Sequence, residues 1–185
     1  MNTAVTSKEE ILKTSRELIR RQGWSAVSIR SVAAGCGVSV GSIYNYFDSK
    51  TDLIGATVES VWCEIFHRPE DDTVFQDVQA CVAWMYQRMA YGCERYPGFF
   101  TLHSLGFLRE DKAAGKQRMQ QTWQHILAGL CSVLKQDVRI RPDAFTEQFT
   151  AEKFADVLFS QMLSALLRQD YDPSAVLEIV RRTLY

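Results

Sequence analysis

Residues Ser28–Lys50 read SIRSVAAGCGVSVGSIYNYFDSK, and this stretch decides how the first part of the chain folds. Apolar side chains recur at helical spacing on the inner faces of two short helices: Ile29, Val32 and Ala33, then Ile43 and Phe47. Gly37 lies between them, where a steep corner needs a residue that adopts positive φ, and Val38 is the apolar residue that such a corner buries. Ser39 is placed to cap the second helix. The stretch is therefore predicted to be a helix-turn-helix.

The outer face of the second helix carries short hydroxyls, an amide and phenols: Val40, Ser42, Tyr44, Asn45 and Tyr46. Such groups reach phosphates and base edges when a helix lies in a major groove. Two short amphipathic helices with a glycine between them also occur in helical proteins that bind no nucleic acid. On spacing alone, both interpretations stay open.

The motif that continues into the next helix is more specific. Residues 38–47 read VSVGSIYNYF, and Ser49-Lys50-Thr51-Asp52-Leu53 follow. This run resembles the signature of the TetR family of bacterial transcriptional regulators, over about the first 55 residues. Val40 stands where the family often has a polar or basic residue or Pro, and Asp48 where it often has Lys, Gly or Asn. Both departures bear on the operator sequence and leave the fold unaffected.

The resemblance implies an all-α fold with about nine helices. Residues 1–53 would form a three-helix DNA-binding domain, and residues 54–185 a helical domain for effector binding and dimerisation. The last two helices would pair with their copies in a homodimer, which would bind a palindromic operator in double-stranded DNA. The alternative is that both faces of these helices are covered within one chain. A repressor released by a small molecule is the expected function. Control by a protein partner or by cysteine oxidation is the alternative.

Candidate DNA contacts fall into two groups. Positioning on the DNA backbone is expected from Ser28, Ser39, Tyr44 and Lys50, and base readout from Arg30, Val40, Ser42 and Asn45, with Tyr46 on the same face. Val40 could touch a thymine methyl group. Lys50 lies in the first turn of a helix that Ser49 and Asp52 are placed to cap, so a phosphate would find both a helix N-terminus and a cation there. Arg30 fits a solvated surface charge equally well.

Net charge is −1 over 185 residues, and 46% of the residues are hydrophobic. The pI of about 6.3 does not indicate a general nucleic-acid coat protein. Residues 1–53 hold seven basic and five acidic side chains, a net of +2, so the remainder carries −3. This uneven distribution favours a protein that touches DNA with one end only.

Other classes of function lack a motif. Five scattered cysteines without a C-x-x-C pair favour reduced thiols over disulfides or a zinc site, so neither a metal nor a cofactor is expected. The three histidines have no motif partners for catalysis, and an enzyme is not expected. No apolar run approaches the roughly 20 residues of a membrane span, and the polar N-terminus indicates a cytoplasmic protein.

Helix signals continue along the whole chain. Ser7 and Glu10 form a capping-box pattern at the start of the first helix, which Gly23 ends, and Trp24 is expected in the core of the small domain. Further helices are predicted over about residues 49–66, 75–95, 111–136 and 143–169, with a short apolar segment over 99–108. Asp172 and Pro173 are predicted to start the last one.

Aromatic residues are dense in the middle of the chain. The resemblance implies a ligand pocket there, with Trp62, Phe66, Trp84, Phe99, Phe100, His103, Phe107 and Trp123 as candidates. His103 or His125 could supply a polar contact, and a flat or lipophilic molecule would suit such a lining. An aromatic stripe at helical spacing also fits plain core, and both interpretations stay open.

Overall fold

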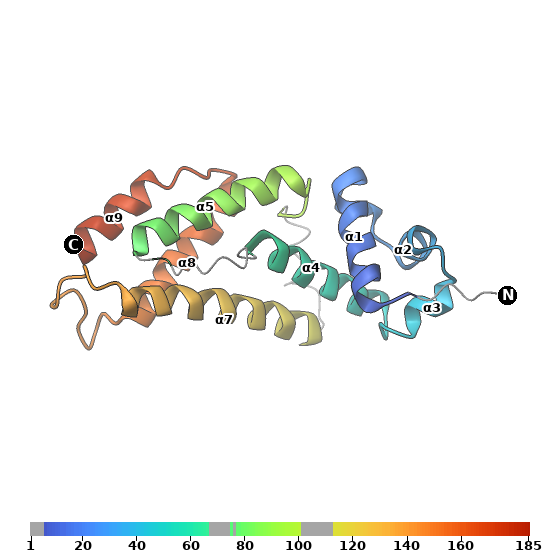
Figure 1. Cartoon of the computed structure of the whole chain (residues 1–185), viewed down its shortest axis with the longest axis horizontal. Helices are drawn as coiled ribbons and strands as arrows, with labels where there is room; N and C mark the ends of the chain where they lie inside the picture. Colours follow the sequence, from blue (N-terminus) through green and yellow to red (C-terminus); the bar gives the residue numbers. More distant parts are fainter. Residues whose placement is uncertain (1–5, 67–74, 76, 101–112) are drawn as a thin grey trace. The chain divides into compact units, whose positions relative to one another are not determined.

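A computed structural model describes residues 6–66, 75, 77–100 and 113–185. Within these ranges the chain forms eight α-helices and one short 3-10 helix, η1, and no strand (Figure 1). The all-α prediction is confirmed, and the helix count is close to the predicted one. The described residues divide into two compact units, one drawn from 1–65 and 92–122 and the other from 66–91 and 123–185. A domain boundary after residue 53 stays a prediction.

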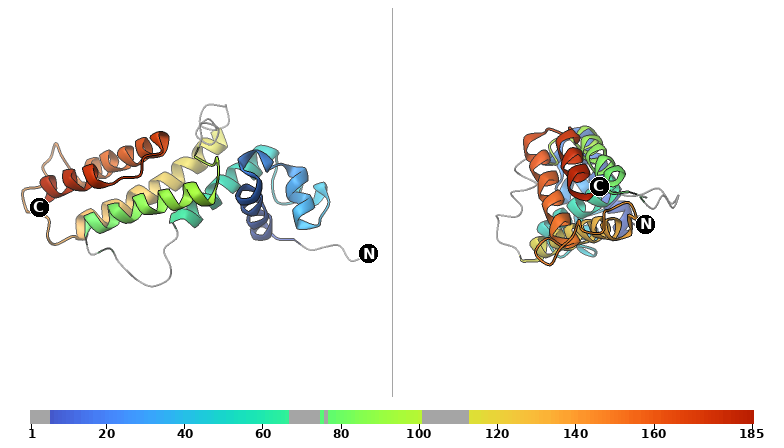
Figure 2. Two further views of the ribbon diagram at one scale, coloured as in Figure 1. Left: turned by 90° about the horizontal axis from the view of Figure 1, so that it is seen from above. Right: turned by 90° about the vertical axis from the view of Figure 1, so that its left-hand side faces the viewer.

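The first unit begins with the predicted three-helix head. Its helices are α1 (Lys8–Gln22), α2 (Ile29–Cys36) and α3 (Val40–Tyr44), with η1 (Trp24–Ala26) between the first two. α1 packs on η1 and α2, and α2 packs on α3. Figures 1 and 2 show this head in shades of blue. Its core is fully buried and apolar: Ile11, Ile19, Val32, Ile43 and Phe47.

Helix ends in the head follow the predicted caps. The Ser7 side chain accepts the Glu10 N–H over 3.1 Å, and Gly23 ends α1 with φ at 81°. Trp24 is only half-buried, and its ring meets Phe99 edge-on with the ring centroids 5.8 Å apart. It joins the head to a later segment of the same unit.

Two longer helices continue the chain, α4 (Lys50–Phe66) and α5 (Val78–Arg95). Gly92 lets α5 approach α4 closely, because a Cβ there would lie 2.6 Å from the Cδ1 of Ile65. A side chain at this position would displace Ile65. The close approach holds the end of α5 against the end of α4 within the first unit.

The second unit contains α8 (Ala151–Arg168), α9 (Ser174–Leu184) and most of α7 (Ala113–Gln136). The predicted start of α8 at Asp143 is wrong. Thr150 caps this helix by accepting the Lys153 N–H over 3.3 Å, and the Thr146 side chain accepts the Phe149 N–H in a turn before it. α9 begins at Ser174 with Pro173 at the N-cap position, so the predicted placement of Pro173 as the first helical residue is one position off, and the Asp172 side chain accepts the Ser174 N–H over 2.9 Å from just ahead of the cap. The predicted first residue of α7, Asp111, lies outside the described residues.

Candidate nucleic-acid interface

The turn between α2 and α3 has the geometry that the sequence predicts. Gly37 adopts φ 67° and ψ 28°, in the left-handed region, and its N–H donates to Ala34. The Val38 N–H donates to the Ala33 carbonyl over 3.0 Å, so the carbonyls at the end of α2 are satisfied. Ser39 then accepts the Ser42 N–H over 3.2 Å and fixes where α3 begins. Val38 itself is half-buried.

α3 buries one face and exposes the other. Ile43 is 0% exposed and Phe47, just after the helix, is 1% exposed. Val40 and Tyr44, on the opposite face, are 40% and 49% exposed. Large apolar and aromatic side chains lose contact energy when they face water alone, so this face is suited to a partner surface. Asn45 and Arg30 are exposed as well.

The three candidate serines already take part in helix caps. Ser28 and Ser31 form a reciprocal capping box at the start of α2, and the Ser39 and Ser42 hydroxyl oxygens lie 2.9 Å apart. A hydroxyl has one donor and two acceptor sites, so each of these groups retains capacity for a phosphate or base contact. Ser28 and Ser42 are half-buried, and Ser39 is exposed.

Tyr46 has a contact that the sequence does not reveal. Its hydroxyl donates to the Thr6 carbonyl over 2.5 Å, although the ring stays 40% exposed. The Lys8 ammonium lies 5.6 Å from the centroid of the neighbouring Phe47 ring, which adds a cation beside the end of α3. Both pairs join residues about 40 positions apart, which no periodic pattern encodes. Lys8 is therefore a candidate phosphate contact that sequence reasoning missed.

Lys50 is the exposed first residue of α4. Ser49 accepts the Asp52 N–H over 3.1 Å, as predicted. The Asp52 carboxylate returns to the N–H of Asp48, one residue earlier than a capping box places it. The helix start is thus well defined, with a lysine at its positive end.

The predicted ligand residues lie in separate aromatic groups. In the first unit, the Trp62 ring lies edge-on to Phe99 and Phe100, with centroids 6.2 and 5.4 Å away. In the second unit, Phe66 meets Trp84 at 6.0 Å, and Trp123 meets Phe159 at 5.8 Å. The buried Nε1 of Trp123 has no hydrogen-bond partner among the described residues. His103 and Phe107 lie outside those residues.

Metal-binding groups and bilayer-crossing helices are both absent from the described ranges. No three His, Cys, Asp or Glu side chains gather there into a metal-binding group. None of the helices in those ranges combines the length and the apolar character that a bilayer crossing requires.

Residues 11–57 match the model of a family described as bacterial regulatory proteins, tetR family. The HTH-type transcriptional regulator YerO of Bacillus subtilis is 40% identical over 52 residues, which are 28% of this chain and 18% of that relative's length. The fold is shared over nearly the whole chain with solved structures at low identity. FadR of Bacillus subtilis in complex with stearoyl-CoA has a TM-score of 0.70 at 17% identity, covering 97% of this chain and 100% of that one.

The multidrug binding protein EbrR complexed with proflavin has a TM-score of 0.59 at 18% identity, covering 96% of this chain and 99% of that one. The chain thus combines a capped helix-turn-helix of the kind found in bacterial regulatory proteins with further α-helices, and it spans 18% of the length of the YerO relative that it matches. The similarity to the tetR family thus covers residues 11–57, and the similarity to the solved structures shows a shared fold over nearly the whole chain.

Proposed function

We propose that the protein is a dimeric repressor that binds a palindromic operator and leaves it when a largely apolar or aromatic molecule binds. The observation that carries the DNA-binding part is the exposed face of α3, where Val40, Tyr44 and Asn45 stand opposite the buried Ile43. Tyr44, Ser39, Ser28 and Lys50 hold the DNA backbone in this proposal. Arg30, Val40, Ser42 and Asn45 read base edges, and Tyr46 stays a candidate contact.

Dimerisation is supported by apolar side chains left uncovered on α8 and α9. Val157, Leu167 and Ile179 are 46%, 58% and 50% exposed. Exposed leucines and isoleucines on two consecutive helices favour a second copy of the same surface as their cover. Two heads about 34 to 36 Å apart would then read half-sites one turn of DNA apart.

An apolar or aromatic effector is supported by the aromatic residues of the second unit. Trp84 and Trp123 belong to the second unit, and the unpartnered Nε1 of Trp123 offers one hydrogen-bond donor among apolar surroundings. The bound molecules of two similar structures, an acyl-CoA and a planar dye, are reasonable first probes for this chain. Release requires that the ligand bind the non-DNA-binding state more tightly.

The alternative signals are a protein partner and cysteine oxidation. All five cysteines are free thiols. Cys63 is exposed, but partial burial and the Glu59 carboxylate raise the pKa of its thiol. A raised pKa lowers the reactive thiolate fraction, so this cysteine is poorly suited to sensing oxidants.

Selection of duplexes from a random pool tests the DNA-binding part of the proposal. The expected product is a palindrome, bound by two chains per duplex. Stearoyl-CoA and proflavin are then titrated into the complex, and release by either at concentrations that raise the melting temperature of the free protein supports the repressor scheme. Selection of no common sequence would refute the DNA-binding part. Retention of DNA under every apolar probe, with release by a pulled-down partner or by peroxide, would favour the alternative signals.

A further inference from the structure

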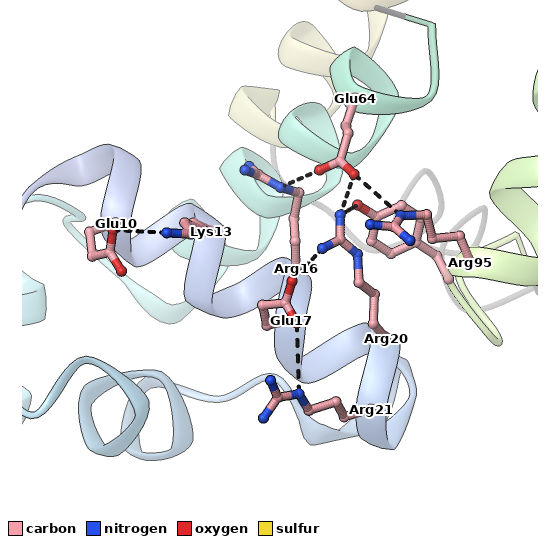
Figure 3. A network of polar contacts seen from close by, with 9 residues as sticks. Glu10, Lys13, Arg16, Glu17, Arg20, Arg21, Glu64 and Arg95 are labelled. Carbon is pink, nitrogen blue, oxygen red and sulfur yellow. Dashed lines mark hydrogen bonds and ion pairs between the residues drawn. The ribbon is translucent and has the colours of Figure 1, made fainter.

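The Glu64 carboxylate, near the end of α4, pairs with three arginines (Figure 3). The Arg16 Nε lies 2.8 Å from it, the Arg20 Nη2 donates to it, and the Arg95 Nε lies 3.6 Å away. The Tyr96 hydroxyl completes the group, which is called the Glu64 cluster below. Its members come from α1, α4 and the end of α5, all within the first unit.

The cluster is ordered by one buried hydroxyl. Tyr96 is 0% exposed, and its hydroxyl accepts from the Arg20 Nη2 over 2.7 Å. Burial and the hydrogen bond to Glu64 raise the pKa of Tyr96 to about 12. The hydroxyl therefore keeps its proton at neutral pH and donates it to the Glu64 carboxylate. The Arg20 guanidinium also lies over the Tyr96 ring, 5.1 Å from its centroid.

Apolar contacts hold the same segment in place. Phe99 packs on Tyr96 and on Trp24, with ring centroids 6.2 and 5.8 Å away. Gly92 brings the end of α5 against Ile65. The segment from Gly92 to Phe100 thus contacts α4 and the corner that joins α1 to η1.

We infer that the Glu64 cluster positions the three-helix head (α1, α2 and α3). It fixes α1 against the end of α5, and thereby sets how tightly the exposed face of α3 binds DNA, although the cluster does not touch that face. α1 packs on α2, which packs on α3, so a shift of α1 also moves α3, the helix proposed to contact DNA. Charge-assisted bonds in a partly buried site are made or broken as a set, which favours two discrete positions over a continuous range. The inference rests on the proposed DNA binding and names positioning residues, since none of them lies on the exposed face of α3.

The test compares Glu64→Gln and Tyr96→Phe with the unmodified protein, on the duplex that the unmodified protein selects. Each variant is expected to bind about tenfold more weakly, with an unchanged slope of affinity against salt, because no phosphate contact is lost. The double variant should bind about as weakly as either single one, since both break the same set of bonds. Glu10→Gln is the matched control, because Glu10 only pairs with Lys13 over 3.8 Å on the exposed side of α1.

Spin labels carried by unnatural amino acids at the exposed positions 13 and 94 report the distance between α1 and the end of α5 directly. A narrow distance distribution in the unmodified protein should broaden in Tyr96→Phe, which retains the ring and its packing. Wild-type affinity and an unchanged distribution in both variants would overturn the inference while leaving the proposed function intact. Absence of any selected duplex for the unmodified protein would instead remove the proposed function.

Discussion

The Asp137 carboxylate accepts the backbone N–H of Val78 over 3.1 Å, although the two residues lie 59 positions apart. This side chain is 0% exposed and also accepts from the Tyr185 hydroxyl and from the backbone and guanidinium of Arg139. A carboxylate at the first N–H groups of a helix acts as its cap and favours the helix dipole. One buried aspartate therefore caps α5 and fixes the residues that follow α7.

Asp137→Ala should lower the free energy of unfolding by about 2 kcal/mol, because it leaves the buried Val78 N–H without its acceptor, while the Arg139 guanidinium keeps its ion pair with Asp77 at 2.9 Å. Urea unfolding followed by circular dichroism measures the change. Asp143→Ala is the control, since Asp143 is 84% exposed and pairs only with Arg141 over 3.5 Å. Equal stability of the two variants would contradict the capping role.

Gly37→Ala should destabilise the protein by about 1 kcal/mol, because an L-residue pays that cost in the left-handed region. No neighbour within 4 Å would obstruct the added Cβ, so backbone strain alone is measured. Gly41→Ala, within α3, should instead stabilise it by about 0.5 kcal/mol. Its Cβ would meet only the Ser39 Oγ at 3.7 Å. Thermal unfolding of the two variants should shift in opposite directions.

Alkaline pH should lower the free energy of unfolding through the ionisation of Tyr96. Its pKa rises from 10.0 to about 12 in the folded chain, so the folded state binds this proton more tightly than the unfolded state does. The stabilisation is fully present below pH 10 and is lost as the pH rises toward 12. The urea midpoint of the unmodified protein should fall more steeply between about pH 9.5 and 11.5 than that of Tyr96→Phe. The reason is that folding of the variant is linked to about one proton fewer than folding of the unmodified protein. Parallel curves would show that another group dominates.

Leu167→Glu combined with Ile179→Glu should shift the protein toward monomer, because charges would replace apolar side chains on the proposed dimer surface. Sedimentation velocity at several concentrations gives the mass. Val138→Glu is a control with the same change in chemistry, since Val138 is 95% exposed in the loop after α7. If the double variant sediments as the unmodified protein does, α8 and α9 do not form the interface.

Tyr44→Ala and Asn45→Ala should separate docking from readout. Loss of the 49% exposed Tyr44 should weaken binding to every duplex, because its role is expected at the backbone. Loss of Asn45 should change the preferred sequence and cost about 1 to 3 kcal/mol on the selected duplex only. Fluorescence anisotropy on the selected and scrambled duplexes distinguishes these results. A Tyr44→Ala variant that binds both as before would eliminate this docking geometry.

The head could be predicted closely because its determinants are local. Ser7, Ser28 and Ser39 each bond an N–H three residues on, and Gly37 supplies the backbone conformation that the corner needs. Such signals lie within one helical turn and can be read along the chain.

The helix predicted over about residues 143–169 begins at Ala151 instead of Asp143. Phe145, Phe149 and Phe154 instead stack in series, with centroids 6.2 and 5.2 Å apart, and this packing draws 145–149 into a turn. Tertiary contact outweighed local helix preference there.

The candidate site was predictable only as a surface. Exposure of Val40 and Tyr44 followed from helical periodicity, whereas the Tyr46 bond to Thr6 and the Glu64 cluster did not. Arg20 is 44 residues from Glu64 and 76 from Tyr96, and charged residues at such separations have no pairing code in the sequence. The contacts proposed to position the three-helix head therefore depend on tertiary packing, which local sequence patterns do not encode.

The Tyr46 bond to the Thr6 carbonyl has a practical consequence for handling the protein. It holds Thr6, which precedes α1, beside the residues that follow α3. A charged tag joined ahead of Thr6 is tethered to this point, so an acidic tag would compete with the DNA phosphates for the surface proposed to bind them, and a cationic tag would add attraction to those phosphates. Binding constants should therefore be measured on protein from which any such tag has been cleaved.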